Sequence, residues 1–303
     1  MFTIFGSGFG LYGYLPALIE LVGQPIVLPE KYRAVVEGRA ELVGLVDRIN
    51  WVSSAEDALE LAERVIFAVP PASQSMLVQK CLDYPRVKSL YLEKPLATTP
   101  IKAKELVDNI LSQQKQVTVG YTLLHTPWAK ALDLKAVTAD EVELNWRFLA
   151  HHYRVGKNNW KSLHSSGGGA LRYYGIHLIA LLYRQGYRNA AQSELYWCGE
   201  DEPYKWKAQF EGTDLPRVSI EVDSKSEEEE FCIFAQGEGK LLSLREPFEE
   251  IQVANSFDPR VSVVANMLAA SLDSAENSET DEIFGGIALW ADAEQFEKPQ
   301  HRL

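Results

Sequence analysis

The sequence predicts a two-domain α/β protein, with a doubly wound parallel sheet first and an α+β domain with an open, largely antiparallel sheet second. The chain has 303 residues, which is more than one compact core usually contains. Over its first 120 residues, short apolar runs alternate with segments of helical spacing, as in a doubly wound sheet. After Tyr121, apolar and polar residues alternate with period two, which is typical of half-exposed antiparallel strands. We therefore expect one domain at residues 1–121 and another at residues 122–303.

The first domain contains short apolar runs that are suited to strands buried on both faces. The expected strands cover residues 2–5, 25–28, a segment near Trp51, 65–69, 88–92 and 116–119. The expected helices cover residues 15–22, 31–42, 55–62, 72–82 and a segment from Thr98 or Thr99 to Gln113. Ser53 or Ser54 is suited to cap the helix at residues 55–62, because serine accepts hydrogen bonds from the first helical turn.

The second domain is expected to contain at least six strands and three helices. The expected strands cover residues 141–148, 195–197, 206–210, 218–222, 231–234 and 241–244. The expected helices cover residues 170–179, 261–272 and 283–296. Between two of these strands, the acidic run from Glu227 to Glu230 is expected to form a solvated turn.

Composition excludes several classes of protein. A net charge of −12 argues against nucleic acid or an anionic membrane surface as the main partner. No apolar run is long enough to span a membrane, and the chain begins with a strand pattern rather than a signal peptide. The three cysteines are odd in number and far apart, which predicts reduced thiols in a cytoplasmic protein. None of them has the spacing of zinc ligands, so we expect no metal.

A glycine-rich turn follows the first strand directly. Gly6, Ser7, Gly8, Phe9 and Gly10 stand between that strand and a run of helical spacing, which is the order a dinucleotide-binding fingerprint requires. Gly6 permits a tight turn, and Gly8 lets the backbone approach a pyrophosphate that the helix N-terminus attracts. The usual third glycine position holds Leu11, and Gly10 stands one residue early. We expect Gly6 to Gly10 to bind a dinucleotide; a plain turn is the alternative.

Two acidic residues are candidates for binding the adenine ribose of that dinucleotide. Glu30 follows the second strand and stands 24 residues after Gly6, close to the roughly 20 that the fingerprint requires. Asp47 ends another apolar run, Leu42 to Val46, but stands 41 residues after Gly6. We prefer Glu30. Either acid favours NAD over NADP, although basic residues beside Glu30 could hold a 2′-phosphate, so both cofactors stay open.

Ser89 to Leu92 is an apolar run that ends in Glu93, Lys94 and Pro95. Ligands of open α/β sheets bind at the carboxyl ends of the strands, so Lys94 is placed where a ligand binds. Pro95 restricts the backbone of Lys94 and holds it at a turn. Pro70 ends the preceding strand and faces the same crevice, so we assign Pro70, Glu93 and Lys94 to the cofactor site. The alternatives are a surface lysine paired with Glu93 and a proline that simply ends its strand.

A second glycine run, Gly167 to Gly169, precedes an apolar helix that contains Tyr173 and His177. These two residues are four apart, so both project from one face of the helix. Gly175 within the helix costs on the order of 1 kcal/mol against alanine, so a close contact is expected to require it. A histidine among isoleucine and leucine is more often a hydrogen-bonded core residue than a catalytic one, and both readings stay open for His177.

Together these segments resemble the Gfo/Idh/MocA oxidoreductases. The resemblance rests on Gly6 to Gly10, Pro16-Ala17-Leu18, Glu93-Lys94-Pro95, and Trp160 followed by Gly167 to Leu171 and His177. It covers nearly the whole chain. It implies a Rossmann domain, a second domain with an open antiparallel sheet, and hydride transfer between NAD(P) and a sugar-like substrate. It also implies a homodimer or homotetramer that packs through the open sheet.

The resemblance implies roles for individual residues as well. Lys94 corresponds to the family lysine that contacts the nicotinamide ribose and the substrate, and His177 to the family histidine near the reacting hydroxyl. Four residues before that histidine the family has an aspartate, whereas this chain has Tyr173; the acid often found three residues after it is Ala180. We expect Lys94, His177 and Tyr173 to be catalytic, with Lys94 or His177 as the base and Tyr173 or Tyr174 as a proton donor or orienting group.

Two functions of different class follow. The first is an NAD(P)-dependent oxidoreductase of a sugar, a nucleotide sugar or another small polar substrate with a hydroxyl or carbonyl group. The second is a degenerate member of the same fold that binds dinucleotide without turnover and acts as a regulator or assembly partner. Loss of the aspartate favours the second function. Retention of Lys94, His177, Trp160 and the second glycine run favours the first, which we prefer.

Overall fold

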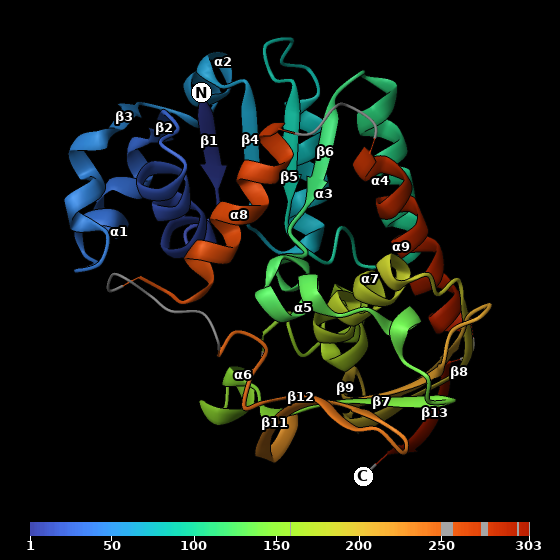
Figure 1. Cartoon of the computed structure of the whole chain (residues 1–303). Helices are drawn as coiled ribbons and strands as arrows, with labels where there is room; N and C mark the ends of the chain where they lie inside the picture. The colour runs from blue at the N-terminus through green and yellow to red at the C-terminus, as the bar shows by residue number, and fades with distance from the viewer. Residues whose placement is uncertain (158, 250–256, 274–277, 296, 303) are drawn as a thin grey trace. The chain divides into compact units, whose positions relative to one another are not determined.

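The computed structural model describes residues 1–157, 159–249, 257–273, 278–295 and 297–302 (Figure 1). The chain divides into two compact units. Unit 1 comprises Met1–Ala97, Glu105–His125 and Ile251–Thr280, and unit 2 comprises Thr98–Lys104, Thr126–Glu250 and Asp281–Leu303. Unit 1 thus takes a helix from the C-terminal part of the chain, whereas the sequence placed everything after residue 121 in the second domain.

The sheet of unit 1 confirms the predicted doubly wound architecture. Its six strands are ordered β3-β2-β1-β4-β5-β6, and every neighbouring pair is parallel. The strands are β1 (Phe2–Phe5), β2 (Ile26–Pro29), β3 (Ile49–Val52), β4 (Arg64–Phe67), β5 (Ser89–Leu92) and β6 (Gln116–Val119). The central strands β1 and β5 are buried along their whole length, which explains their continuous apolar runs.

Helices connect these strands, as the sequence predicted. They are η1 (Gly10–Tyr14), η2 (Ala17–Leu21), η3 (Glu30–Tyr32), α1 (Arg33–Glu37), η4 (Val43–Arg48), α2 (Ala55–Leu61), α3 (Pro71–Cys81) and α4 (Pro100–Ser112). The short helix η5 (Thr122–His125) follows β6. Ser54 rather than Ser53 caps α2, in a reciprocal capping box with Asp57. The helix expected at residues 31–42 is short, since α1 covers only Arg33–Glu37.

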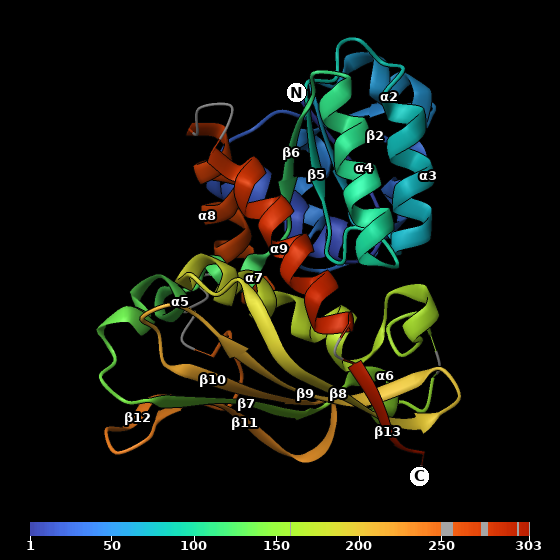
Figure 2. The same cartoon turned by 90° about the vertical axis from the view of Figure 1, so that its right-hand side faces the viewer.

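Helix α8 (Arg260–Asp273) packs on the helices that follow β1. Its residues Val261, Val264 and Leu268 are buried in one core cluster with Leu11 and Leu18 of the first helical segment. Figure 2 shows α8 on one face of the parallel sheet and α3 on the opposite face. The sequence predicted α8 as a helix but gave no sign of which part of the chain it covers.

Unit 2 contains a seven-stranded, mostly antiparallel sheet, as predicted. Its order is β12-β11-β7-β10-β9-β8-β13, and only the pairs β7–β10 and β8–β13 are parallel among the described strands. The strands are β7 (Glu141–Leu149), β8 (Asn189–Gly199), β9 (Glu202–Glu211), β10 (Arg217–Asp223), β11 (Lys225–Ala235), β12 (Gly239–Leu244) and β13 (Glu297–Arg302). The expected turn at Glu227 to Glu230 is wrong: these residues lie within β11, where the exposed end of a long strand accommodates the charges.

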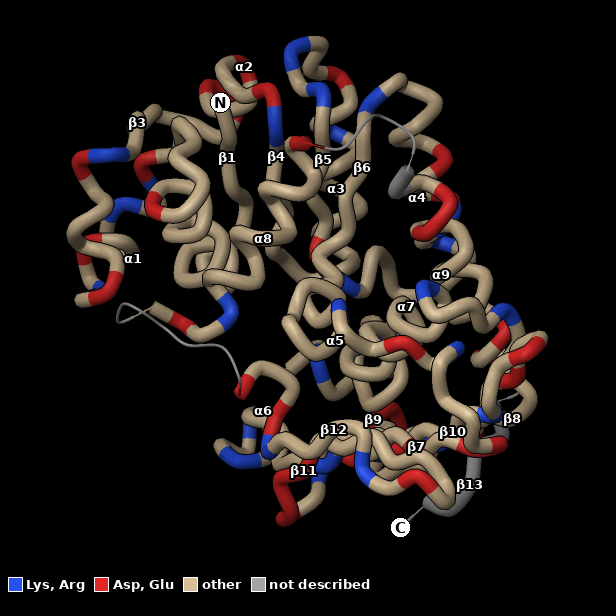
Figure 3. The backbone as a smooth tube through the Cα atoms, in the orientation of Figure 1, with Lys and Arg blue, Asp and Glu red and all other residues tan. Residues whose placement is uncertain are grey.

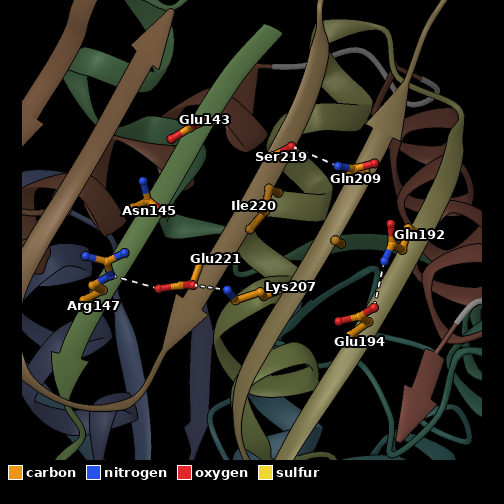
Figure 4. Close-up of a pocket in the computed structure, with 11 residues that line it drawn as sticks. Glu143, Asn145, Arg147, Gln192, Glu194, Lys207, Gln209, Ser219, Ile220 and Glu221 are labelled. Atoms are coloured by element: carbon orange, nitrogen blue, oxygen red, sulfur yellow. Dashed lines mark hydrogen bonds and ion pairs between the residues drawn. The ribbon is translucent and has the colours of Figure 1, made fainter. Parts of the chain in front are cut away.

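One face of this sheet is covered by helices and the other carries polar side chains. Unit 2 contains α5 (Pro127–Ala131), η6 (Leu134–Ala136), α6 (His151–Arg154), η7 (His164–Ser166), η8 (Ala170–Gly175), α7 (Ile176–Gln185) and α9 (Ser278–Gln295). On the outer face, Glu221 of β10 pairs with Arg147 at 2.9 Å and with Lys207 at 2.8 Å (Figure 4). These residues line a shallow hollow of about 350 Å³ that contains none of the predicted site residues.

Charge is mixed along the described backbone. Figure 3 shows acidic and basic residues interspersed in both units. None of the helices in the described part of the chain is both long enough and apolar enough to cross a membrane.

Candidate functional site

The glycine turn after β1 combines one closely packed glycine with one exposed, open glycine. Gly6 has φ +132°, and a Cβ built on it would lie 2.2 Å from the carbonyl oxygen of Ala68. No other residue fits there, because the conformation is unfavourable for L side chains and the space is occupied by backbone. By contrast, a Cβ on Gly8 would have no atom within 4 Å, so the backbone at Gly8 is open to a ligand.

Gly10 allows the first helical segment to pack closely on β1. Its Cβ would lie 2.9 Å from Cγ2 of Ile4 and 3.2 Å from Cβ of Ala68, so the start of the helix packs directly on β1 and on the residue after β4. The helical segment begins with the π-helical turns of η1, and in this register Gly10 faces the strands. The close helix–strand approach that the fingerprint requires is therefore present despite Leu11.

Replacing Gly8 with alanine is expected to leave the free energy of unfolding within about 0.5 kcal/mol of wild type, since the new methyl group meets no atom. The same methyl group would stand between the turn and a pyrophosphate, so the dissociation constant of a nicotinamide cofactor is expected to rise on the order of tenfold, or 1.4 kcal/mol. Urea denaturation and a fluorescence titration measure the two quantities. Unchanged affinity would show that no ligand approaches Gly8.

Glu30 begins η3 directly after β2, which is the strand beside β1. It is exposed and pairs with Arg33 at 3.2 Å, while the Arg33 guanidinium lies 5.0 Å from the centre of the Trp51 ring. The backbone N–H of Gly6 donates to the Tyr32 hydroxyl at 3.2 Å, which ties η3 to the glycine turn. The rival acid, Asp47, lies in η4 rather than at a strand end, so the interpretation of Leu42 to Val46 as a strand is wrong.

Lys94 follows β5 in a turn that is held from several sides. The Lys94–Pro95 peptide bond is cis. The carboxylate of Glu93 accepts a hydrogen bond of 2.6 Å from the buried Tyr14 hydroxyl, and a Cβ on Gly120 would lie 2.8 Å from both of those oxygen atoms. Pro70 is the residue before α3 and follows the end of β4, the strand next to β5.

The electrostatic setting of Glu93 combines burial with nearby cations. Burial raises the pKa of the Glu93 carboxyl, whereas Lys94, the Tyr14 hydroxyl and Arg260 act in the opposite direction. Burial and the Glu93 charge both raise the pKa of Tyr14 well above its usual value, so Tyr14 is the hydrogen-bond donor of the pair.

Arg260, the first residue of α8, brings the C-terminal part of the chain to the glycine turn. Its guanidinium lies 4.4 Å from the centre of the Phe9 ring and binds both carboxylate oxygens of Asp258, at 2.8 and 2.7 Å. Phe9 in turn packs on Gly13, where a Cβ would lie 2.4 Å from the ring. Sequence reasoning missed Tyr14, Gly120 and Arg260, because no local pattern relates residues that are this far apart in the chain.

In unit 2, His177 and Tyr173 occupy successive turns of one helical segment. His177 is 5 % exposed and lies in α7, and Tyr173 lies in η8. The Tyr173 ring is in edge contact with Trp160 at 5.3 Å between ring centres, and the amino group of Lys161 lies 5.2 Å from the centre of the Tyr173 ring. Trp160, Lys161 and Tyr173 thus form one aromatic and basic cluster.

The second glycine run is required by close packing. A Cβ on Gly168 would lie 2.3 Å from the carbonyl oxygen of Trp160, and one on Gly169, whose φ is +82°, would lie 2.4 Å from Cγ of Pro203. The expected close contact at Gly175 is confirmed, since its Cβ would lie 2.6 Å from the Trp206 ring. The glycines therefore press the Tyr173 helix against β9 and the Trp160 segment.

A buried ion pair fixes the same helical segment to α9. Arg172 donates to both carboxylate oxygens of Glu294, at 2.6 and 3.0 Å, and to the carbonyl oxygen of His164 at 2.7 Å. Burial and the Arg172 charge lower the pKa of His164 from 6.5 to about 4. The His164 ring is therefore neutral at neutral pH.

Stability is expected to fall on acidification because of His164. Its folded-state pKa of about 4 lies below that of the unfolded chain, near 6.5, so the unfolded state binds the proton more tightly. The contribution is complete above about pH 6.5, is lost as the pH falls toward 4, and amounts to at most about 3 kcal/mol. In urea denaturation across this range, wild type should lose up to about 3 kcal/mol more stability on acidification than His164→Gln. The exposed His151, changed to glutamine, is the control; parallel curves for His164→Gln would contradict the assignment.

Comparison with known proteins finds similarity in structure but not in sequence. No protein-family model and no curated protein sequence matches the chain. The structure is similar to the WlbA dehydrogenase from Bordetella pertussis, solved with NADH and UDP-GlcNAcA, with a TM-score of 0.72 at 14% identity, covering 97% of this chain and 96% of that one. This is a shared fold.

Two further solved structures extend the comparison. D-galactose-1-dehydrogenase from Rhizobium etli has a TM-score of 0.71 at 16% identity, covering 99% of this chain and 95% of that chain. KijD10, a 3-ketoreductase from Actinomadura kijaniata solved with NADP and TDP-benzene, has a TM-score of 0.70 at 13% identity and covers 98% of both chains. Proteins with this two-unit fold therefore include sugar dehydrogenases and a ketoreductase, two of them solved with a nicotinamide cofactor.

Proposed function

We propose that the chain is an NAD(P)-dependent oxidoreductase of the Gfo/Idh/MocA family that acts on a hydroxyl or carbonyl group of a sugar-like substrate. The observation that supports this proposal best is that two predicted site residues, Gly8 and Lys94, lie at the same edge of the parallel sheet in unit 1. The open backbone of Gly8 follows β1 and Lys94 follows β5, so both stand at the carboxyl ends of parallel strands, where ligands of such sheets bind.

The residues at this edge fit a nicotinamide dinucleotide. Gly8 admits a pyrophosphate at the start of a helix, and Glu30 stands beside it at the end of β2, where a carboxylate accepts hydrogen bonds from the ribose hydroxyls. This arrangement favours NAD. Arg33, which already pairs with Glu30, is the residue that would meet a 2′-phosphate of NADP. A bound nicotinamide would supply the hydride acceptor or donor.

The roles of the catalytic residues follow the resemblance. Lys94 would bind the nicotinamide ribose and the reacting oxygen, and His177 would take the hydroxyl proton during oxidation or return it during reduction. Tyr173 stands where the family has an aspartate and would orient the substrate through its hydroxyl. Lys161 next to the Tyr173 ring gives this cluster a positive charge, which suits a substrate that carries an anionic group.

The substrate class we propose is a sugar or a sugar nucleotide. Solved proteins of this fold hold UDP-GlcNAcA or TDP-benzene, or are named for galactose. The homodimer or homotetramer that the resemblance implies stays a prediction.

The degenerate regulator is the second candidate, and the replacement of the family aspartate by Tyr173 is the observation that favours it. A direct assay distinguishes the two. The chain is mixed with NAD or NADP and a panel of sugars and sugar nucleotides, and absorbance of the reduced nicotinamide is followed. The enzyme proposal expects turnover with at least one member of the panel. Cofactor binding without any reduction, across both cofactors and the whole panel, would favour the regulator.

A further inference from the structure

We propose that Gln74 and Tyr14 are positioning residues for Lys94, so that α3 and the first helical segment together hold the turn that presents the lysine. This inference rests on the proposed function, because it assigns a task in the same site. Neither residue carries a sequence motif that predicts such a role. All the residues involved lie in unit 1.

The Gln74 side chain forms hydrogen bonds with the backbone before and after Lys94. Its amide nitrogen donates to the carbonyl oxygens of Glu93 at 2.9 Å and Leu96 at 3.0 Å, and its amide oxygen accepts from the Glu93 N–H at 3.0 Å. Gln74 is completely buried, so no water competes for these bonds. The Glu93 N–H also donates to the Phe67 carbonyl oxygen at 3.0 Å, so Gln74 is one of two acceptors for that group and the donor to the two carbonyl oxygens.

Tyr14 fixes the neighbouring carboxylate. Its hydroxyl donates to Glu93 Oε1 at 2.6 Å, and the ring is 1 % exposed. Gly120, which follows β6, leaves the space in which the two oxygens meet, because a Cβ there would lie 2.8 Å from each. The Glu93 carboxylate is therefore held in place by the hydrogen bond from Tyr14, and the absence of a side chain at Gly120 leaves room for it.

The Gln74 hydrogen bonds are concentrated on the turn that contains Lys94. The three Gln74 bonds all end on the four-residue turn from Glu93 to Leu96, and that turn contains the lysine assigned to the chemistry. Misplacing a reacting group by about 1 Å costs on the order of 100-fold in rate. Loss of these bonds is therefore expected to appear in kcat while the glycine turn, on another strand, still binds cofactor.

The test compares wild type with Gln74→Met and Gln74→Glu, with Gln79→Glu as matched control. Gln79 is exposed on the same helix and bonds only Asn109 among the described residues. Both Gln74 variants are expected to lose about 100-fold in kcat with cofactor Kd within threefold. Hydrogen exchange by mass spectrometry is expected to rise in the peptide that covers Glu93 to Leu96, and the control should match wild type in all three measurements.

Tyr14→Phe gives a second, independent readout. Loss of the hydroxyl removes an interaction that holds down the pKa of Glu93, so the acid limb of the pH–rate profile is expected to move to higher pH. An unmoved limb would count against Tyr14.

Two outcomes overturn the inference for Gln74. Unchanged hydrogen exchange in Gln74→Met would show that the amide does not hold the turn, whatever the activity. Faster exchange with an unaltered kcat would show that the turn is held but that catalysis does not depend on it. Failure of the proposed function is seen separately, as absence of turnover in wild type before any variant is compared.

Discussion

Lys94→Ala is expected to lower kcat by roughly 10²- to 10⁴-fold while leaving the dissociation constant of the cofactor within a few-fold of wild type. The two quantities are expected to respond differently because Lys94 and the backbone assigned to the pyrophosphate follow different strands. Lys94 stands at the carboxyl end of β5, in a turn held by the Gln74 side chain. Its proposed cofactor contact is to the nicotinamide ribose alone, whereas the pyrophosphate is assigned to the open backbone of Gly8 after another strand. Steady-state kinetics and a parallel cofactor titration measure both quantities.

Lys88→Ala is the matched control for that prediction. Lys88 is an exposed lysine just before β5, at the opposite end of the same strand, so the substitution makes the same chemical change away from the proposed site. It should leave kcat and cofactor affinity unchanged. Equal losses in the two variants would mean that the effect is one of general charge or stability and not of position.

Gly6→Ala is expected to destabilise unit 1 by roughly 3 kcal/mol or more. The new methyl group would meet the Ala68 carbonyl at 2.2 Å, and the backbone at φ +132° is one that alanine rarely adopts. Backbone strain and overpacking each cost about 1–3 kcal/mol. Urea denaturation followed by tryptophan fluorescence gives the free energy of unfolding.

Gly23→Ala separates the two contributions to that loss. Gly23 also has positive φ, +68°, but a Cβ there would have no atom within 4 Å, so only strain of about 1–2 kcal/mol is expected. A Gly6 variant that loses no more stability than the Gly23 variant would contradict the close packing of the glycine turn on the residue after β4.

The first sheet could be predicted closely because strands β1, β2 and β5 are buried along their whole length. Runs such as Phe2 to Phe5 and Ser89 to Leu92 are apolar throughout, and each coincides with a strand of the structure or lies within a residue of one. Long-range packing was not predictable in the same way. Helix α8 carries an apolar face like any other amphipathic helix, and nothing local shows that this face covers the first helical segment.

In the candidate site too, local sequence patterns predict some residues, whereas others depend on long-range packing. Lys94 could be placed from sequence because a strand pattern ends at it, and the gap in the fingerprint at Leu11 turns out to be filled by Gly10. Tyr14 and Gln74 could not be placed, since they reach the Glu93 turn across 79 and 19 residues of sequence. Hydrogen bonds of this kind depend on three-dimensional register and leave no periodic signal.

Calorimetric titration of the full chain with NADH and with NADPH, with Gly8→Ala as the comparison, tests the proposed dinucleotide site directly. We expect saturable binding at one site per chain, tighter for NADH than for NADPH, and weakened on the order of tenfold by the Gly8 substitution. If neither cofactor binds to folded wild-type protein, the proposed function is contradicted and the glycine turn is a structural feature alone.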